Sequence, residues 1–238
     1  MAAVLVVVLG TIIAMLHTEI GKAKQPAPLA SILAKSSAIN RLSAARFFLF
    51  ASRDIWFVVA LPVFLSEQFD WSFEAIGAFL AAWVIGYGAV QSVAPRLIGV
   101  DHVHAATSWS LALALLTAAI ATAVAADTAV SLAVIGGLIA FGVVFAVNSS
   151  LHSYLILAYS RGPDDVAMDV GFYYSANAMG RLVGTLLSGL LYLWGGLSTA
   201  LWGSAAFLTV TWLLTLRLPA FDDERATARP EGRAVSSS

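Results

Sequence analysis

A charged pair, Arg53 and Asp54, lies near the middle of an otherwise apolar run, LSAARFFLFASRDIWFVVALPVFL. A charge at the centre of a membrane span costs about 2.5–3.5 kcal/mol on insertion scales, so it faces a bundle interior, a partner or water. A second arginine, Arg181, lies in another apolar run, VGFYYSANAMGRLVGTLLSGLLYLWGG. Two buried guanidinium groups in one small helical bundle indicate a pathway for an anion.

The composition predicts an all-α integral membrane protein. Hydrophobic residues make up 60% of the chain and charged residues 11%, with a mean hydropathy of +0.86, whereas soluble domains are about a quarter charged. There is no cysteine, which excludes disulfides and thiolate metal sites, and the net charge of −1 gives no support for nucleic-acid binding. No basic segment precedes the first apolar run, so we expect no cleavable signal peptide.

Seven apolar runs are candidates for membrane spans, each of which needs about 20 residues. We predict spans at residues 1–16, 44–65, 73–95, 106–126, 129–157, 170–194 and 197–216. The predicted organisation is a shortened first membrane helix at 1–16, a cytoplasmic linker at 17–41, a six-helix bundle at 42–219, and a disordered cytoplasmic tail at 220–238.

The basic residues predict the orientation, because lysine and arginine concentrate in cytoplasmic loops. Ten of the thirteen basic residues fall in alternate loops or in the tail, and the opposite loops, near Gln68, Asp127 and Gly196, contain none. We therefore expect a multi-pass protein of the cell's inner (plasma) membrane with its N-terminus outside and its C-terminus in the cytoplasm.

Polar residues are distributed unevenly among the spans. The runs 106–126 and 197–216 carry no charge and could face lipid, which leaves four helices to line a path. Arg53 and Arg181 lie ~14 Å and ~16 Å from the cytoplasmic ends of their predicted spans at 1.5 Å per residue. Both depths are near the midplane of a ~30 Å hydrocarbon core, where transporter sites commonly lie.

Two further sets of polar residues are candidates for substrate binding, because the members of each set lie on one helix face. Tyr174, Asn177 and Arg181 are spaced i, i+3, i+7, and Asn148 and His152 are spaced i, i+4. For Asn148 and His152, hydrogen bonding between helices is an equal alternative to lining a cavity.

The charged pair has a structural alternative as well. Arg53 could simply be neutralised by Asp54 in an ion pair that fixes packing, and Asp54 is also a candidate proton carrier. Arg46, near the start of its predicted span, is expected to snorkel to the inner interface rather than bind substrate. Gly180, Gly184 and Ser188 form a small-residue stripe that predicts close helix packing.

Three stretches resemble the C-terminal half of major facilitator superfamily permeases: NRLSAARFFLFASRDIWFVVALPVFL, WSFEAIGAFLAAWVIGYGAVQSVAP and GFYYSANAMGRLVGTLLSGLLY. More narrowly, RDIWFVV and GFYYSANAMGRL resemble the organoarsenical efflux permeases of arsenic-resistance operons (ArsJ type). The resemblance covers roughly residues 1–220.

The resemblance implies two six-helix bundles around a central cavity and proton-coupled export by alternating access. The implied substrate is 1-arseno-3-phosphoglycerate, formed when glyceraldehyde-3-phosphate dehydrogenase accepts arsenate, which makes that enzyme a functional partner. Its phosphate and arsenate groups suit paired arginines, because a guanidinium binds such oxyanions bidentately. The resemblance implies no cofactor and no metal.

The chain departs from this family in its number of spans. A complete member would have about twelve, so the resemblance implies a missing N-terminal six-helix half as a partner, supplied by a separate chain or lost from a truncated gene. A seven-helix receptor, an intramembrane enzyme and a non-functional fragment are the alternatives. A retinal protein would need a lysine within a span, and an intramembrane enzyme would need a nucleophile or a metal set. The runs show neither.

Overall fold

The computed structural model describes residues 10–11, 36–97, 102–160 and 163–219, and every regular element in these ranges is an α-helix. The chain divides into two compact units, Met1–Ala34 and Lys35–Ser238, and all the long helices belong to the second. Apart from residues 10–11, the predicted span 1–16 lies outside the described residues, as do the predicted linker up to residue 35 and the predicted tail 220–238.

The first span consists of two helices, α3 (Ser37–Phe57) and α4 (Ala60–Phe69), separated by a break at Val58–Val59. Helix α3 begins after Ser36, whose Oγ accepts a hydrogen bond of 3.2 Å from the N–H of Ile39. This cap satisfies one of the backbone donors that a helix start leaves unpaired. The helix therefore begins seven residues before the predicted run at 44.

The next three helices match predicted runs to within four residues at each end. They are α5 (Phe73–Leu97), α6 (His102–Ala125) and α7 (Val130–Tyr159), predicted at 73–95, 106–126 and 129–157. All three are long and apolar enough to cross a membrane.

Helix α8 (Pro163–Thr215) contains two predicted spans. Its backbone is not helical at Gly195 and Gly196, and Gly196 has a φ of 67°, which glycine adopts without steric cost. A straight helix over the candidate span Val166–Thr215 would be about 75 Å long, far more than a bilayer core. The two legs, up to Trp194 and from Leu197, correspond to the predicted spans 170–194 and 197–216.

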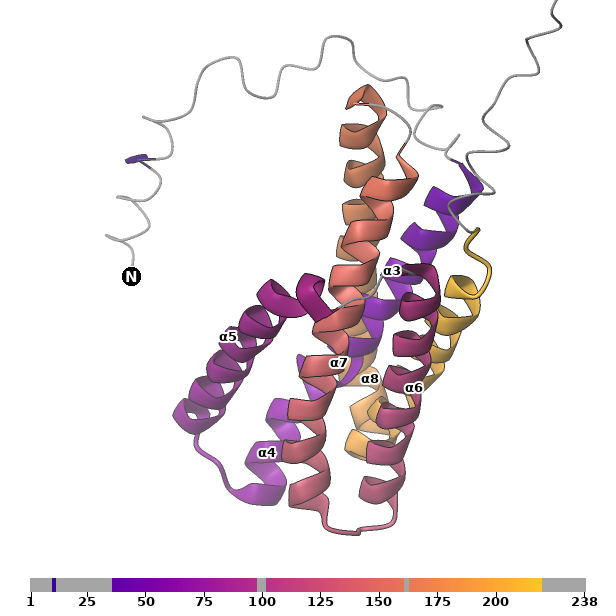
Figure 1. Ribbon diagram of the computed structural model, residues 1–238. Coiled ribbons are helices and arrows are strands. Elements are labelled where there is room, and N and C mark those ends of the chain that lie inside the picture. The colour runs from indigo at the N-terminus through magenta and orange to yellow at the C-terminus, as the bar shows by residue number, and fades with distance from the viewer. Residues whose placement is uncertain (1–9, 12–35, 98–101, 161–162, 220–238) are drawn as a thin grey trace, which may run out of the picture. The chain divides into compact units, whose positions relative to one another are not determined.

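The all-α membrane fold is therefore confirmed, with a small difference in the count of spans. By length and composition the described residues contain five candidate spans, the last of which is the two-legged α8. Successive legs run in alternate directions, so the α4–α5 and α6–α7 connections lie at one end of the bundle and the start of α3 lies at the other (Figure 1).

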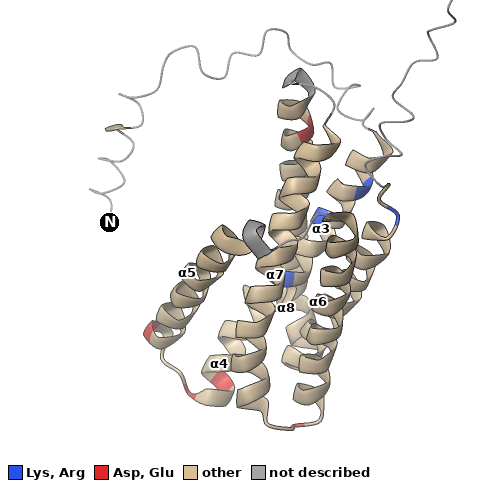
Figure 2. Ribbon diagram, viewed as in Figure 1, with Lys and Arg blue, Asp and Glu red and all other residues tan. Residues whose placement is uncertain are grey.

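Charged side chains lie mostly at the ends of the bundle (Figure 2). Acidic residues gather around the α4–α5 connection, which carries Glu67, Asp70 and Glu74. At the opposite end, Nη1 of Arg41 donates a hydrogen bond of 2.6 Å to the carbonyl oxygen of Arg217. The predicted alternation of spans places Arg41 and Arg217 at the same end of the bundle, as the structure shows. That this end faces the cytoplasm stays a prediction.

The helices differ in how much of their surface they bury. The most extensive contact is between α3 and α8, while α5 packs mainly against α7. Of an apolar 18-residue stretch in each helix, only 11% is buried in α5, compared with 33% in α6. The uncharged run 106–126 in α6 was predicted to face lipid, yet α6 is more buried than α5. The buried fraction therefore does not distinguish lining helices from lipid-facing ones.

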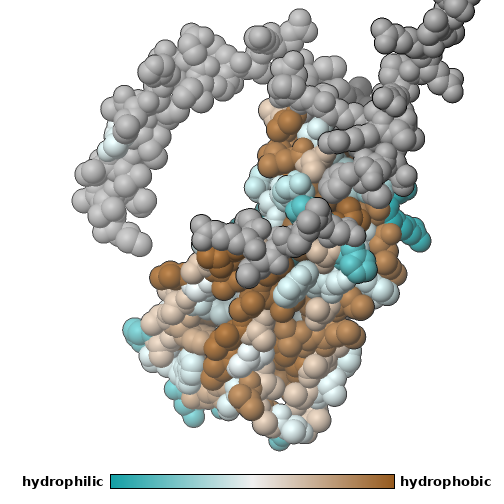
Figure 3. Space-filling view, viewed as in Figure 1, coloured by the Kyte–Doolittle hydropathy of each residue, from teal (hydrophilic) through white to brown (hydrophobic). Residues whose placement is uncertain are grey.

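The interior contains two hydrophobic clusters and a polar layer. On α3 one cluster ends at Leu42 and the other begins at Leu49, and the buried residues between them include Arg46. The visible outer surface is largely hydrophobic along the length of the bundle, with hydrophilic side chains toward its ends (Figure 3). This is the pattern of a helical bundle that spans a bilayer.

Candidate functional site

Small residues of α8 bring its first leg into backbone contact with α3. A Cβ added at Gly180 would collide with the carbonyl oxygen of Phe47, and one added at Gly184 would stand 2.5 Å from that of Ala51. Only residues without a side chain allow two helix backbones to approach this closely. The predicted packing role of the stripe is confirmed.

The third stripe residue, Ser188, lies at the break between α3 and α4. Its Oγ accepts hydrogen bonds from the N–H groups of Val59 at 3.2 Å and Ala60 at 3.1 Å. Helices kink where a side chain takes the place of backbone acceptors. Ser188 therefore stabilises a bend in the first span one turn beyond Arg53 and Asp54.

The close approach brings Arg53, Asp54 and Arg181 together. Nε and Nη2 of Arg53 lie 2.7 Å and 2.6 Å from Oδ1 of Asp54, and Nε of Arg181 lies 3.1 Å from Oδ2. Each carboxylate oxygen thus accepts from one arginine. The carboxylate that pairs with Arg181 comes from α3, since the apolar run around Arg181 offers none.

This cluster has one positive charge more than its carboxylate neutralises. The side chain of Asp54 is 1% exposed and that of Arg53 is 14% exposed, while that of Arg181 is 57% exposed. A guanidinium has five N–H donors in one plane, and the hydrogen bond of Arg181 to Asp54 uses only its Nε. Donors of Arg181 therefore remain available to a ligand.

The other predicted members of the α8 face lie beside the cluster along the same leg. Tyr174 is 49% exposed, and Asn177 is half-buried. Oδ1 of Asn177 is buried and has no hydrogen-bond partner among the described residues. The face that carries Tyr174, Asn177 and Arg181 is thus open enough for contact with a ligand.

Asn148 of α7 is fully buried and is used in packing. Its Nδ2 donates to the carbonyl oxygens of Trp109 at 2.9 Å and Val144 at 3.1 Å, and its Oδ1 accepts from Oγ of Ser110 at 3.0 Å. Both amide hydrogens are taken, so no donor of this side chain is left for a substrate. Of the two alternatives for Asn148, the structure shows the hydrogen bonds that link α6 and α7.

The expectation that Arg46 snorkels to the interface is wrong. Because α3 begins at Ser37, Arg46 lies in the third turn, and only 3% of its surface is exposed. Its Nη1 donates to both the carbonyl oxygen and Oγ of Ser149, each at 3.1 Å. The same Oγ accepts from Nε2 of Gln91 at 3.2 Å, which connects α3, α7 and α5.

His152 lies one turn beyond Ser149 on α7 and is fully buried. Neither ring nitrogen has a hydrogen-bond partner among the described residues. A buried polar atom without a partner is uncommon and calls for an explanation, such as an ion or a ligand. For His152 the structure thus shows no hydrogen bond between helices.

Aromatic rings lie beside both Arg46 and Arg53, and these aromatic residues were not predicted as site residues. The Cζ of Arg46 lies 4.0 Å from the ring centroid of Phe50, and that of Arg53 lies 5.1 Å from the same centroid. Arg53 also lies 5.5 Å from the ring of Phe145. The spacing i, i+4, i+7 of Arg46, Phe50 and Arg53 places all three on one helix face, and this signal could have revealed the arrangement.

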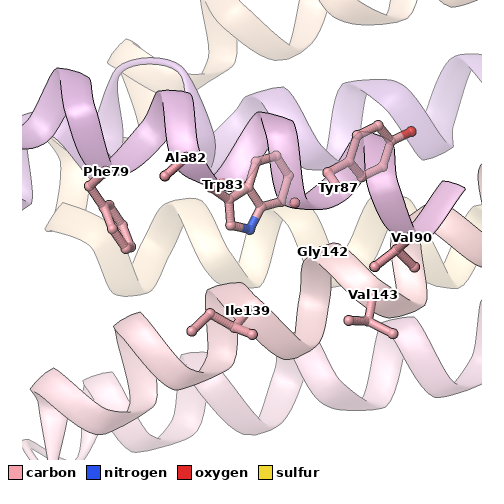
Figure 4. A pocket seen from close by; sticks show the side chains of 9 residues that line it. Phe79, Ala82, Trp83, Tyr87, Val90, Ile139, Gly142 and Val143 are labelled. Carbon is pink, nitrogen blue, oxygen red and sulfur yellow. The ribbon is translucent and has the colours of Figure 1, made fainter. Parts of the chain in front are cut away.

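An apolar groove of about 310 Å³ lies between α5 and α7. Trp83 lies over Gly142, where an added Cβ would be 2.9 Å from the indole Nε1, and that nitrogen donates to the carbonyl oxygen of Leu138 at 2.9 Å (Figure 4). The ring of Trp83 stacks on Tyr87 with centroids 5.7 Å apart. None of the groove's lining residues is charged.

Among the residues that the structure describes, no group of three His, Asp or Glu side chains could hold a metal ion. Fold and site together define a multi-pass helical membrane protein with arginines inside its bundle. The sequence profile of the Major Facilitator Superfamily matches residues 42–238. Because the match covers most of the chain, the chain belongs to this superfamily, whose members are membrane transporters rather than enzymes. No curated protein matches the chain.

Proposed function

We propose that the chain is part of a secondary active transporter that binds a small organic anion at Arg53, Asp54 and Arg181. The observation that carries this proposal is the convergence of two guanidinium groups on a single carboxylate between α3 and α8. A charged group within a span is retained where it serves a substrate or ion pathway. The partly exposed Arg181 supplies the free donors that an oxyanion needs.

The proposed substrate is 1-arseno-3-phosphoglycerate, exported in arsenate resistance. Support comes from the resemblance of RDIWFVV and GFYYSANAMGRL to organoarsenical efflux permeases, and from the fit between arginine forks and oxyanions. In this proposal glyceraldehyde-3-phosphate dehydrogenase makes the substrate. The transporter lies in the inner membrane with its C-terminus in the cytoplasm. A second six-helix bundle, from a separate chain or a longer gene, completes the cavity.

Asp54 is the proposed proton carrier. A substrate oxyanion and the carboxylate of Asp54 compete for the same two guanidinium groups, so a proton on Asp54 favours anion binding. Transport into vesicles should therefore respond to an imposed pH gradient, and Asp54→Asn should abolish that response. Uptake that ignores the gradient in the unmodified protein would remove Asp54 from the mechanism.

Arsenate resistance tests the proposal in an arsenic-sensitive bacterial host that expresses an arsenate-accepting glyceraldehyde-3-phosphate dehydrogenase. Four forms are compared: the chain alone, the chain with an N-terminal half supplied, and the latter with Arg181→Ala or with Arg217→Ala. Arg217 lies just beyond the end of α8, outside the charged cluster, and is the matched control.

We expect resistance from the completed form and from its Arg217→Ala variant, and none with Arg181→Ala. Resistance from the chain alone would show that it assembles with itself. If no form confers resistance, the arsenical substrate is wrong and only membership of the superfamily stands.

A further inference from the structure

Arg46 is a buried cation with no carboxylate beside it. Among the described residues, Asp54 forms ion pairs with Arg53 and Arg181, and Arg46 forms none. Its side chain lies between the two hydrophobic clusters, where removing an unpaired charge from water costs several kcal/mol. Nothing in the proposed site of Arg53, Asp54 and Arg181 accounts for this charge.

The groups around Arg46 are neutral. Ser149 accepts two hydrogen bonds from one nitrogen, Nη1, and the rings of Phe50 and Tyr173 lie 4.0 Å and 4.8 Å from the guanidinium carbon. Cation–π contacts with these rings offset part of the cost of burial but leave the charge itself unneutralised. The environment is that of an anion site whose remaining ligands are polar and uncharged.

Unpaired polar atoms lie in the same part of the bundle. Nε of Arg46 and both ring nitrogens of His152 are buried without a hydrogen-bond partner among the described residues. His152 lies on the face of α7 that carries Ser149, the residue to which Arg46 donates. One guanidinium donor and one imidazole are therefore both available at this place.

We propose that Arg46, Ser149, Gln91 and His152 form a second oxyanion-binding site, and that the transported molecule carries an oxyanion group at each end. Arg46 binds one end, and Arg53 with Arg181 binds the other. The inference rests on the proposed function, because it specifies the class of anion that the transporter takes.

The separation of the two sites favours such a molecule. The Cζ atoms of Arg46 and Arg53 lie 4.0 Å and 5.1 Å from the centroid of the same Phe50 ring, so these atoms are at most about 9 Å apart. Two oxyanion groups joined by a short carbon chain can reach both sites, whereas one inorganic ion can occupy only one. A molecule with two oxyanion groups therefore makes contacts at both sites that a single inorganic ion makes at only one.

Access to Arg46 requires a movement of α8. Tyr173, on its first leg, is fully buried and lies over the guanidinium, and Arg46 itself is 3% exposed. Tyr174 and Arg181 on the same leg are exposed. Displacement of this leg from α3 would uncover Arg46 and also weaken the contact between Arg181 and Asp54, so opening of the two sites is coupled.

The test uses the purified full chain in lipid nanodiscs and isothermal titration with two probes, inorganic phosphate and the stable bisphosphate of 1,3-propanediol. We expect two phosphate ions per chain but a single bisphosphate. Arg46→Gln should lower bisphosphate affinity by about tenfold or more, as expected for lost hydrogen bonds to a charged group. It should also leave one phosphate site unchanged. Arg181→Gln should weaken the phosphate site that Arg46→Gln leaves unchanged.

Arg41→Gln is the matched control, since Arg41 is an exposed arginine of the same helix and should leave both probes unaffected. Arg46→Lys keeps the charge but loses the planar fork, and it replaces Arg46→Gln if that variant does not fold. The phosphate stoichiometry of the unmodified chain needs no variant.

A single phosphate site, or bisphosphate affinity that Arg46→Gln leaves unchanged, would overturn the second site while the proposed function stands. If the unmodified chain binds neither probe, the proposed anion site fails and this inference fails with it.

Discussion

Replacing Gly184 with alanine should loosen the contact that positions the charged cluster. The added Cβ would stand 2.5 Å from the carbonyl oxygen of Ala51 and 3.0 Å from Cβ of Asp54. Favourable contact distances are about 3.5 Å or more, so α8 and α3 must separate by about 1 Å. Overpacking of this kind costs about 1–3 kcal/mol. The same separation lengthens the 3.1 Å contact between Arg181 and Asp54.

The assay is unfolding of the purified chain in mixed micelles by a denaturing detergent, followed by circular dichroism. Gly189→Ala is the matched control, because Gly189 is on the same leg of α8 and an added Cβ would meet nothing within 4 Å. Alanine stabilises a helix interior by about 0.5–1 kcal/mol relative to glycine, so Gly189→Ala should be neutral or stabilising. Equal stability of the two variants would refute the argument that Gly184 is required for close contact.

Three further substitutions test separate hydrogen bonds by the same unfolding assay. Asn148→Leu should lower stability by about 1–3 kcal/mol because it leaves the hydroxyl of Ser110 unpaired, yet it should not change anion affinity; an affinity loss without destabilisation would contradict the packing role. Ser188→Ala removes the acceptor at the α3–α4 break and should cost about 1–3 kcal/mol; unchanged stability would mean that the break needs no side-chain acceptor. Trp83→Phe loses the hydrogen bond to Leu138 and should cost about 0.5–1.5 kcal/mol; a larger loss would indicate that ring packing dominates.

The spans were predictable because a helix that crosses a bilayer needs a long apolar run, and such runs end at charged or glycine-rich turns. The break at Gly195 and Gly196 was predicted as a gap between two spans, and it is the place where the backbone leaves helical geometry. The break at Val58–Val59 was not predicted, although Pro62 signals it, because a proline has no N–H and its ring crowds the carbonyl four residues earlier, here that of Val58. Its acceptor, Ser188, is 129 residues away from Val59.

Depth was harder to predict than topology. Hydropathy predicts that the span containing Arg46 begins at Ala44, which would place Arg46 near a membrane surface. The helix begins at Ser37 because Ser36 caps it. Residues 37–43 are therefore helical, although they include the polar Asn40 and Arg41. Hydropathy reports where apolar residues begin, whereas a cap determines where the helix begins, and here the two differ by seven residues.

The partner of Arg181 could not be predicted from its own span. In the sequence, the packing role of Gly180 and Gly184 and the charge of Arg181 are separate features, but the structure links them. Asp54 lies on α3 with its Cβ 3.0 Å from the position of an added Gly184 Cβ, so the glycine contact is what brings Arg181 within 3.1 Å of that carboxylate. A partner stabilises a charge inside a span, and Arg181 reaches its partner only because the two backbones touch. The glycines therefore position the charged cluster as well as pack the helices, and any motion that separates α8 from α3 must also change how the charge of Arg181 is compensated.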